Sequence, residues 1–234
     1  MNGTAIVTGG TGGLGVAVVE RLLSDGWRVV VPWVAEHELE RLEERGGLEL
    51  IKADLFEPES VAEVVAAADS PPLSGLVNLV GGFAAGARVH ETPLEDFDRQ
   101  FKLNLRPTYL VTQAALGAML PRTPGPDGRV GGSIVCVGTR AALQPFSGAA
   151  GYVSSKAAVI AFAQAVAVEY RDAGIRCNAI LPSVIDTPGN RASMPDADFD
   201  RWVEPAEIAG VIAHLLSEDS APTSGAAIPV YGRA

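Results

Sequence analysis

The segment TAIVTGGTGGLGVAVVERLLS, residues 4–24, combines a short apolar run, a glycine-rich loop and a helical pattern. Residues 4–8 are the apolar and β-branched types of a buried strand, whereas the residues from 13 onward have helical periodicity. The glycines between them remove side chains where the backbone would approach a pyrophosphate, and the following helix offers unpaired N–H groups and a positive dipole end. A glycine motif alone is weak evidence, but this strand–loop–helix context indicates a dinucleotide site.

The same alternation continues along the chain. Apolar runs predict strands at 27–31, 48–51, 75–80, 132–137, 175–181 and 227–230. Helices are predicted at 13–24, 36–45, 58–68, 94–119, 151–172 and 204–217. Such alternation predicts a doubly wound α/β fold with about seven parallel strands in three layers. The Pro/Gly-rich stretch at 121–132 is typical of a surface loop, so residues 1–234 are expected to form one domain.

Composition excludes several classes of protein. A net charge of −10 argues against nucleic-acid binding and against docking on an anionic membrane. No apolar run approaches the roughly 18 residues of a membrane span, and the N-terminus lacks the features of a secretory signal. Cys136 and Cys177 lie in apolar runs and are expected to be buried thiols in a reducing cytoplasm. The histidines form no zinc motif, so no metal is expected.

Tyr152 and Lys156 are four residues apart in a helical run and therefore share one helix face. A lysine ammonium beside a phenol favours the phenolate and lowers the pKa of the tyrosine. We therefore expect Tyr152 to donate or accept a proton near neutral pH. Thr139, which follows the strand at 132–137, offers a hydroxyl nearby.

Together with the glycine loop, this pair resembles the short-chain dehydrogenase/reductase family over essentially the whole chain. The family's T-G-x-x-x-G-x-G spacing fits residues 8–15, Asn78-x-x-Gly81 resembles its N-N-A-G stretch, and residues 178–187 resemble N-A-I-x-P-G-x-I-x-T. The resemblance implies a Rossmann-like fold and hydride transfer between an NAD or NADP nicotinamide and a small carbonyl or alcohol. Its implied cofactor-binding residues are Gly9, Thr11, Gly12, Gly13, Leu14, Gly15, Trp33, Asp54, Leu55, Asn78, Gly81, Gly82, Tyr152, Lys156, Pro182, Ile185 and Thr187.

The resemblance also implies four catalytic roles. Tyr152 is the general acid/base, and Lys156 lowers its pKa and binds the nicotinamide ribose. Thr139 stands where the family usually has serine and would polarise the substrate, because its hydroxyl can form the same hydrogen bond. Asn104 would hold a proton-relay water.

The cofactor preference is open. An acidic residue at the end of the second strand would favour NAD, but Trp33 occupies that place. His37 and Arg41 begin the next predicted helix and could reach a 2′-phosphate. The missing carboxylate gives a slight preference for NADP.

Three stretches resemble one branch of the family, the quinonoid dihydropteridine reductases. They are GGFAAG at 81–86, GTRAAL at 138–143 and DTPGNRASMPDADFDRW at 186–202. This resemblance implies that Phe83 stacks on the substrate and that Thr139 is dispensable. Reduction of a pterin or similar heterocycle is therefore an alternative function, and a non-catalytic dinucleotide sensor is a second one. Retention of both Tyr152 and Lys156 argues against the sensor.

The helical run from residue 151 to 172 is apolar nearly all round and should be buried on more than one side. One side should pack on the sheet and the other on a second subunit. We expect a homodimer or homotetramer formed through the 94–119 and 151–172 helices, because the family assembles in this way. The acidic helix predicted at 36–45 is expected to face solvent.

Overall fold

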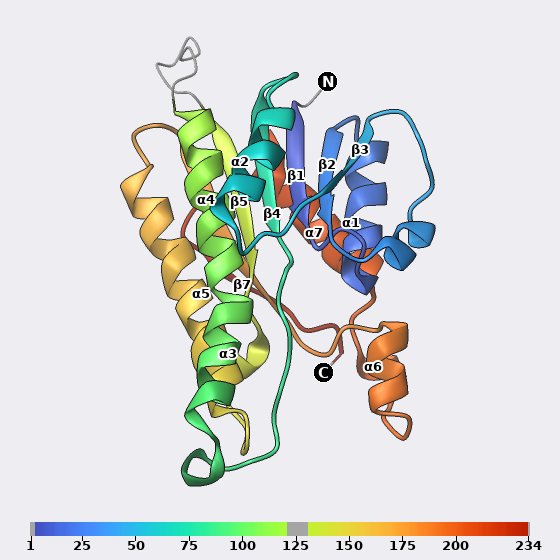
Figure 1. The fold of residues 1–234 in the computed structure, drawn as a ribbon, viewed down its shortest axis with the longest axis vertical. Helices are drawn as coiled ribbons and strands as arrows, with labels where there is room; N and C mark the ends of the chain where they lie inside the picture. Colours follow the sequence, from blue (N-terminus) through green and yellow to red (C-terminus); the bar gives the residue numbers. More distant parts are fainter. Residues whose placement is uncertain (1–2, 121–130, 234) are drawn as a thin grey trace.

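The computed structural model describes residues 3–120 and 131–233, so most of the loop predicted at 121–132 lies outside it. Seven parallel strands form one sheet in the order β3-β2-β1-β4-β5-β6-β7 (Figure 1). The strands are β1 (Thr4–Thr8), β2 (Arg28–Trp33), β3 (Leu48–Lys52), β4 (Leu73–Asn78), β5 (Gly132–Val137), β6 (Ile175–Pro182) and β7 (Ala227–Val230). The predicted α/β architecture is confirmed.

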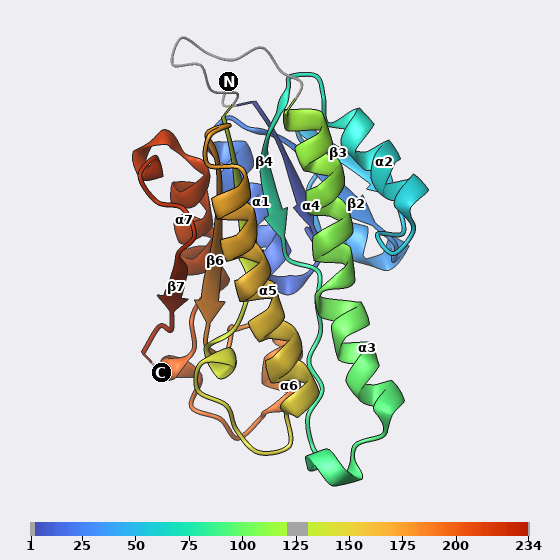
Figure 2. The same ribbon diagram turned by 90° about the vertical axis from the view of Figure 1, so that its left-hand side faces the viewer.

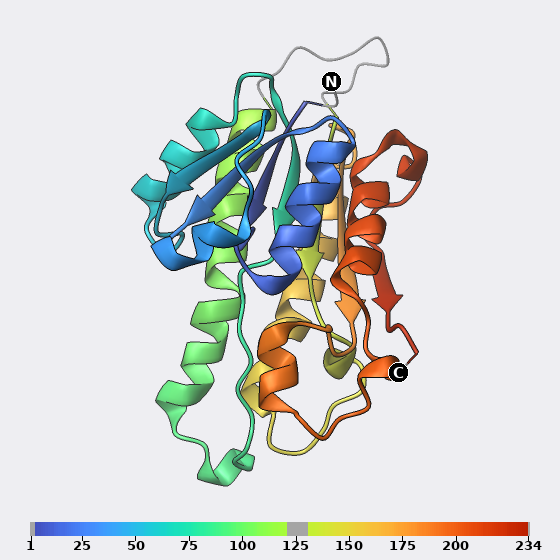
Figure 3. The ribbon, with the colours of Figure 1, turned by 90° about the vertical axis from the view of Figure 1, so that its right-hand side faces the viewer.

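Helices cover both faces of this sheet. On one face lie α2 (Pro58–Ala67), α4 (Arg106–Met119) and α5 (Ala150–Glu169), with α3 (Leu94–Asn104) packed beside α5 (Figure 2). On the other face lie α1 (Gly13–Ser24) and α7 (Pro205–Leu216), which pack on each other (Figure 3). Each face has its own core of buried aliphatic side chains, which makes the sheet a rigid scaffold for the loops at its edge.

The prediction of a helix at 36–45 is wrong. The chain forms only a short 3₁₀ helix, η1 (Glu36–Arg41), and Leu42 is its one buried neighbour. A single buried leucine gives this acidic stretch no continuous apolar face to pack, and tertiary contacts decide its conformation instead. Those contacts run from Glu38 and Arg41 to Thr11.

The single helix predicted at 94–119 is two helices, α3 and α4, separated at Leu105. Pro107 explains the break, because proline donates no backbone hydrogen bond and restricts the residue before it. The break places Asn104, the last residue of α3, inside the protein with no exposed surface. The break between α3 and α4 therefore determines where the Asn104 side chain lies in the site.

Helix α5 is long and apolar enough to cross a bilayer by length and composition, with a mean hydropathy of 1.3. This differs from our expectation that no apolar run approaches that length. The physical reason is that one face of α5 packs against β5 and β6 in the core, while its other face is also apolar. In the fold, α5 is a core helix that carries the buried Lys156.

Short helices and loops extend beyond the carboxyl ends of the strands, where parallel α/β sheets bind ligands. The short helices there are η2 (Val89–Glu91), η3 (Arg140–Ala142), α6 (Pro188–Ser193) and η4 (Phe199–Arg201). A further short helix, η5 (Glu218–Ser220), follows α7 instead. Helix α6 lies within the short segment after Thr187, where no helix was predicted (Figure 3). Proline occupies the first turn of α2 and of α7, where its missing N–H costs no helical hydrogen bond.

Candidate active site

The loop between β1 and α1 leaves no room for a side chain at Gly10, Gly13 or Gly15. Gly9 has a φ of +67°, and a Cβ on Gly15 would overlap the Gly9 carbonyl. A Cβ on Gly10 would lie 2.7 Å from Val31 of β2. The loop therefore brings bare backbone to the N-terminus of α1, including Leu14 in its first turn. This shape fits the pyrophosphate of a dinucleotide.

Thr187 closes the other side of this loop. A Cβ on Gly13 would lie only 2.9 Å from the Thr187 side chain. The Thr187 hydroxyl also caps α6 by accepting from the Asn190 N–H at 3.2 Å, and the Asn190 side chain donates to the Ile185 carbonyl at 2.8 Å. The segment that follows Pro182 at the end of β6 is thus held over the glycine loop, and its contact with a cofactor stays a prediction.

Glu38 and Arg41 both form hydrogen bonds with Thr11 of the glycine loop, and the sequence did not predict these contacts. The Thr11 hydroxyl donates to a carboxylate oxygen of Glu38 at 2.7 Å, and the Arg41 guanidinium donates to the Thr11 carbonyl at 3.1 Å. Arg41 also pairs with Glu38 at 3.2 Å. Sequence pattern gave no signal for this contact, because it depends on how η1 folds back. Trp33 lies at the end of β2 under the ammonium of Lys52, 5.7 Å from its ring centre.

Asn78 is buried at the end of β4, and its side-chain oxygen has no hydrogen-bond partner. Its amide group donates to the Thr112 hydroxyl at 3.0 Å and to the Cys136 sulfur at 3.8 Å. Cys136 and Cys177 are buried free thiols, as predicted. A buried oxygen without a hydrogen-bond partner costs free energy. The Asn78 oxygen therefore fits a ligand bound at the carboxyl ends of the strands, as the shape of the glycine loop also does.

Asp54 and Leu55 follow β3, farther from the catalytic residues along the strand order. The Asp54 carboxylate accepts from the Phe56 N–H at 2.9 Å, and Leu55 is buried in the core. Their predicted contact with an adenine stays a prediction. Among the described residues, no group of three or more His, Cys, Asp or Glu could hold a metal ion.

The structure brings Tyr152 and Thr139 together. Thr139 follows β5 and its hydroxyl caps η3 by accepting from the Ala141 N–H at 3.3 Å. Burial raises the pKa of Tyr152, and the Thr139 side chain beside it lowers this pKa only in part. The expectation that Lys156 sets a lowered pKa is wrong for the protein alone, because desolvation of the phenol dominates.

Lys156 is buried one helical turn from Tyr152. Its ammonium donates to the Val137 carbonyl at the end of β5, at 2.9 Å. Burial lowers the pKa of Lys156 to about 8, and the nearby Cys136 thiol opposes this shift. The Lys156 ammonium is therefore held in place by a main-chain carbonyl at the end of β5.

Asn104 links three parts of the site. Its side-chain oxygen accepts from the Gly82 N–H at 2.9 Å, and its amide donates to the Ser155 hydroxyl at 3.1 Å. Ser155 in turn donates to the Tyr152 carbonyl at 2.8 Å. A Cβ on Gly81 would lie 2.6 Å from Asn104 and 3.0 Å from the Lys156 ammonium. Ser155 was not identified from the sequence, although its spacing from Tyr152 places it on the same helix face.

Phe83 lies directly beside Tyr152. The two ring centres are 4.9 Å apart and the rings are nearly perpendicular. A second ring, Phe146, lies 6.3 Å from Phe83 and was not identified from the sequence. Its position after η3 in a Pro-containing loop carries no periodic signal.

The comparisons agree with this geometry. A model of the short chain dehydrogenase family matches residues 3–198. The chain is 30% identical to 2-(R)-hydroxypropyl-CoM dehydrogenase of Xanthobacter autotrophicus, over 99% of this chain and 98% of that protein. It is 33% identical to (3R)-3-hydroxyacyl-CoA dehydrogenase of Rattus norvegicus, over 97% and 94% of the two chains. A structure of a variant actinorhodin polyketide ketoreductase with NADPH matches with a TM-score of 0.86 at 29% identity, covering 98% and 96%.

The fold and the site define an NAD(P)-dependent oxidoreductase. The chain belongs to the short-chain dehydrogenase/reductase family. The comparisons support the family as a whole and do not identify the dihydropteridine reductase branch.

Proposed function

We propose that this enzyme interconverts a small carbonyl compound and its alcohol, with Tyr152 as the general acid/base. The observation that carries the proposal is the place of Thr139 beside the Tyr152 phenol, whose pKa it lowers, together with the buried Lys156 one helical turn away. A bound NAD(P) would supply or accept the hydride. It would lie on Gly9–Gly15, under Thr187, with Asn78 and Gly81 beside its nicotinamide end.

The side chains of the protein supply the proton and stabilise the charge that its transfer leaves. A raised pKa keeps the Tyr152 phenol protonated at neutral pH, so it donates to the carbonyl oxygen during reduction. The Thr139 hydroxyl orients the same oxygen and stabilises the phenolate that remains. Lys156 adds positive charge below the phenolate and reaches the ribose, while Asn104 positions Gly82 and the turn of α5 that carries Tyr152.

Tyr152→Phe tests this assignment. We expect turnover to fall by roughly 10²–10⁴-fold, the usual contribution of a general acid, while NAD(P)H still binds. Cofactor fluorescence measures binding and cofactor absorbance measures turnover. Unchanged turnover would contradict the assignment.

We infer a preference for NADP. Solved neighbours of this chain were crystallised with NADPH, and Trp33 leaves no carboxylate at the end of β2. Arg41 is held at the glycine loop by Thr11, where a 2′-phosphate could replace Glu38 as its partner. Matched initial rates with NADPH and NADH test this preference.

Reduction of a pterin-like heterocycle is the second candidate, and the ring of Phe83 beside Tyr152 favours it. Thr139→Ala separates the two functions. Loss of carbonyl reduction would support carbonyl chemistry, whereas full activity on a quinonoid dihydropterin would support the second candidate.

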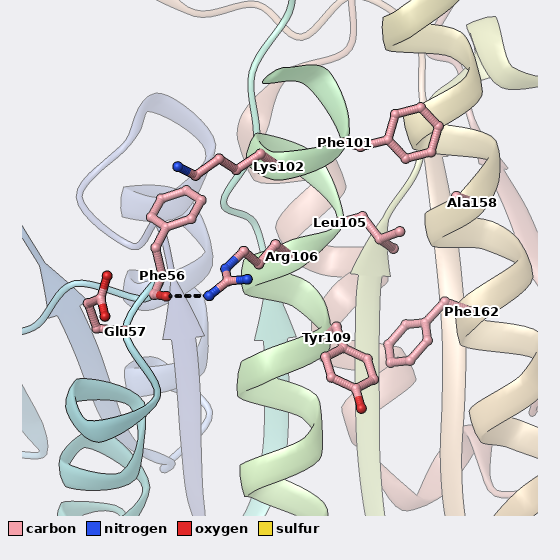
Figure 4. Close-up of a pocket in the computed structure, with 9 residues that line it drawn as sticks. All are labelled: Phe56, Glu57, Phe101, Lys102, Leu105, Arg106, Tyr109, Ala158 and Phe162. Atoms are coloured by element: carbon pink, nitrogen blue, oxygen red, sulfur yellow. Dashed lines mark hydrogen bonds between the residues drawn. The ribbon is translucent and has the colours of Figure 1, made fainter. Parts of the chain in front are cut away.

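We propose further that the enzyme is soluble and cytoplasmic. We also propose that two copies of the chain associate through α4 and α5. A groove of about 720 Å³ runs between these helices and the start of α2, lined by aromatic rings of Tyr109 and Phe162 and by Glu57 and Arg106 (Figure 4). Tyr109 is 47% exposed although its ring centre lies 5.9 Å from that of Phe162, so part of the ring is open to a second copy. Opposite charges in one groove can pair across a two-fold axis. Phe162→Glu should convert the dimer to monomer in a sizing experiment, and a monomeric parent would contradict the proposal.

A further inference from the structure

Two loops from different strands meet above Tyr152. One follows β4 and carries Phe83, and the other follows η3 and carries Leu143 and Phe146. The Gly86 N–H donates to the Gly148 carbonyl at 2.8 Å, which fixes the loops against each other. Gly148 has a φ of +82°, and a Cβ there would lie 2.8 Å from the Gly86 carbonyl. This close approach depends on glycine and sets the distance between the two aromatic side chains.

The loops present apolar side chains to solvent around the catalytic phenol. Phe83 is 65% exposed, Leu143 is 58% exposed and Phe146 is 50% exposed. Large exposed apolar side chains gathered at a catalytic group mark a binding surface better than scattered ones do. Phe83 is held edge to face by Tyr152, so part of its surface stays open while its position is fixed.

The charged side chain in the second loop turns away from these rings. The Arg140 guanidinium donates to the Gln144 side chain at 2.9 Å and lies 5.0 Å from the ring centre of Tyr231. Lys156 is buried and bound to Val137. The ring of Phe83 therefore lies against the phenol with Phe146 next to it, while the protein as a whole is strongly acidic, with a net charge of −10. This environment suits an uncharged substrate better than a phosphorylated one.

We propose that Phe83 and Phe146 form the substrate subsite and that it binds an uncharged planar ring bearing the reacting carbonyl. This rests on the proposed function and specifies its substrate class. Aromatic rings prefer offset or edge-to-face contacts at centre distances of about 4.5–7 Å, the range these rings already adopt with their neighbours. A planar ring can contact Phe83 and Phe146 together and lose little conformational entropy, whereas an open-chain ketone must order several bonds.

The reaction in this subsite balances as a two-electron reduction. A hydride from the reduced cofactor adds to the ring carbonyl carbon, and the π pair moves to oxygen. That oxygen takes the Tyr152 proton, so the ketone becomes an alcohol and NAD(P)H becomes NAD(P)⁺. The tyrosinate regains a proton from solvent.

Isatin, a planar ring ketone, and ethyl acetoacetate, an open-chain ketone, provide the test. Phe83→Leu and Phe146→Leu keep an apolar side chain and remove each ring. We expect each variant to lower kcat/KM for isatin by about 3–10-fold, through KM, with the ester changed by less than about 2-fold. Phe101→Leu, which removes a ring from α3 at the groove in Figure 4, should leave both values unchanged.

Oxindole, which lacks the reducible ketone, separates this subsite from the proposed reaction. Calorimetry should show that it binds the wild-type protein with cofactor and Tyr152→Phe equally, and binds both leucine variants more weakly. Ring-dependent oxindole binding without turnover of either ketone would reject the proposed function and keep the subsite. The subsite is rejected if oxindole does not bind, or if both ketones lose activity equally in the leucine variants.

Discussion

The Lys156 ammonium donates a hydrogen bond to the Val137 carbonyl at 2.9 Å, one helical turn from Tyr152. This bond anchors the charge, but burial still lowers the pKa of Lys156 to about 8 from 10.5. The unfolded chain therefore binds more protons than the folded one between these two pH values. It follows that stability rises with pH across this window, because deprotonation removes the cost of a buried charge.

Lys156→Met should remove that dependence. The pKa difference corresponds to about 3 kcal/mol, an order-of-magnitude figure. We expect the parent's free energy of unfolding to rise from pH 8 toward pH 10.5 relative to that of the variant, as measured by urea denaturation at each pH. The loss of the Val137 hydrogen bond shifts the variant by a pH-independent amount of about 1–3 kcal/mol, so the slope is the diagnostic quantity.

Lys102→Met on the surface of α3 is the matched control and should keep the slope of the parent. Equal slopes in the parent and Lys156→Met would mean that water reaches the ammonium in solution.

Gly15→Ala should abolish cofactor binding, because its Cβ would overlap the backbone oxygen of Gly9. The comparison is Gly117→Ala in α4, where a Cβ meets nothing within 4 Å. Alanine there should raise stability by about 0.5–1 kcal/mol through helix propensity. Cofactor fluorescence and thermal unfolding measure both effects. Wild-type cofactor affinity in Gly15→Ala would show that the loop rearranges.

Asn104→Ala should change substrate affinity as well as stability. The half-buried Gly82 N–H loses its acceptor, which costs about 0.5–1.5 kcal/mol, and Gly82 precedes Phe83. We expect KM for the ketone to rise and Tm to fall. Ser155→Ala removes only the second partner of Asn104 and should affect KM less. A fall in kcat alone, with a larger solvent isotope effect, would instead support the predicted relay-water role.

The fold and the glycine loop could be predicted because their signals are local. Residues 4–24 contain strand, loop and helix in one segment, and Tyr152 and Lys156 are one helical turn apart. Their place in the fold follows from hydrophobic periodicity and from the ordered connections of a parallel sheet.

The contacts that tune the site could not be predicted, because they join distant segments. Glu38 reaches Thr11 only since η1 is a short turn rather than the expected helix. Phe146 reaches Phe83 because Gly86 and Gly148 join two loops. The direction of the Tyr152 pKa shift depends on burial, which the spacing of two residues does not reveal.

Arg41→Gln tests how the enzyme distinguishes its two cofactors. Arg41 is fixed by the Thr11 carbonyl and paired with Glu38, so a 2′-phosphate must compete with that carboxylate. We expect Arg41→Gln to raise KM for NADPH by about 10–100-fold, the scale of one charge-assisted hydrogen bond, and to leave KM for NADH unchanged. Glu38→Gln should lower KM for NADPH, because it removes the competing charge. Arg45→Gln, whose guanidinium donates to Ser24 instead, is the control. Equal effects of Arg41→Gln on both cofactors would assign Arg41 to loop structure, since a contact with the 2′-phosphate can act on NADPH alone.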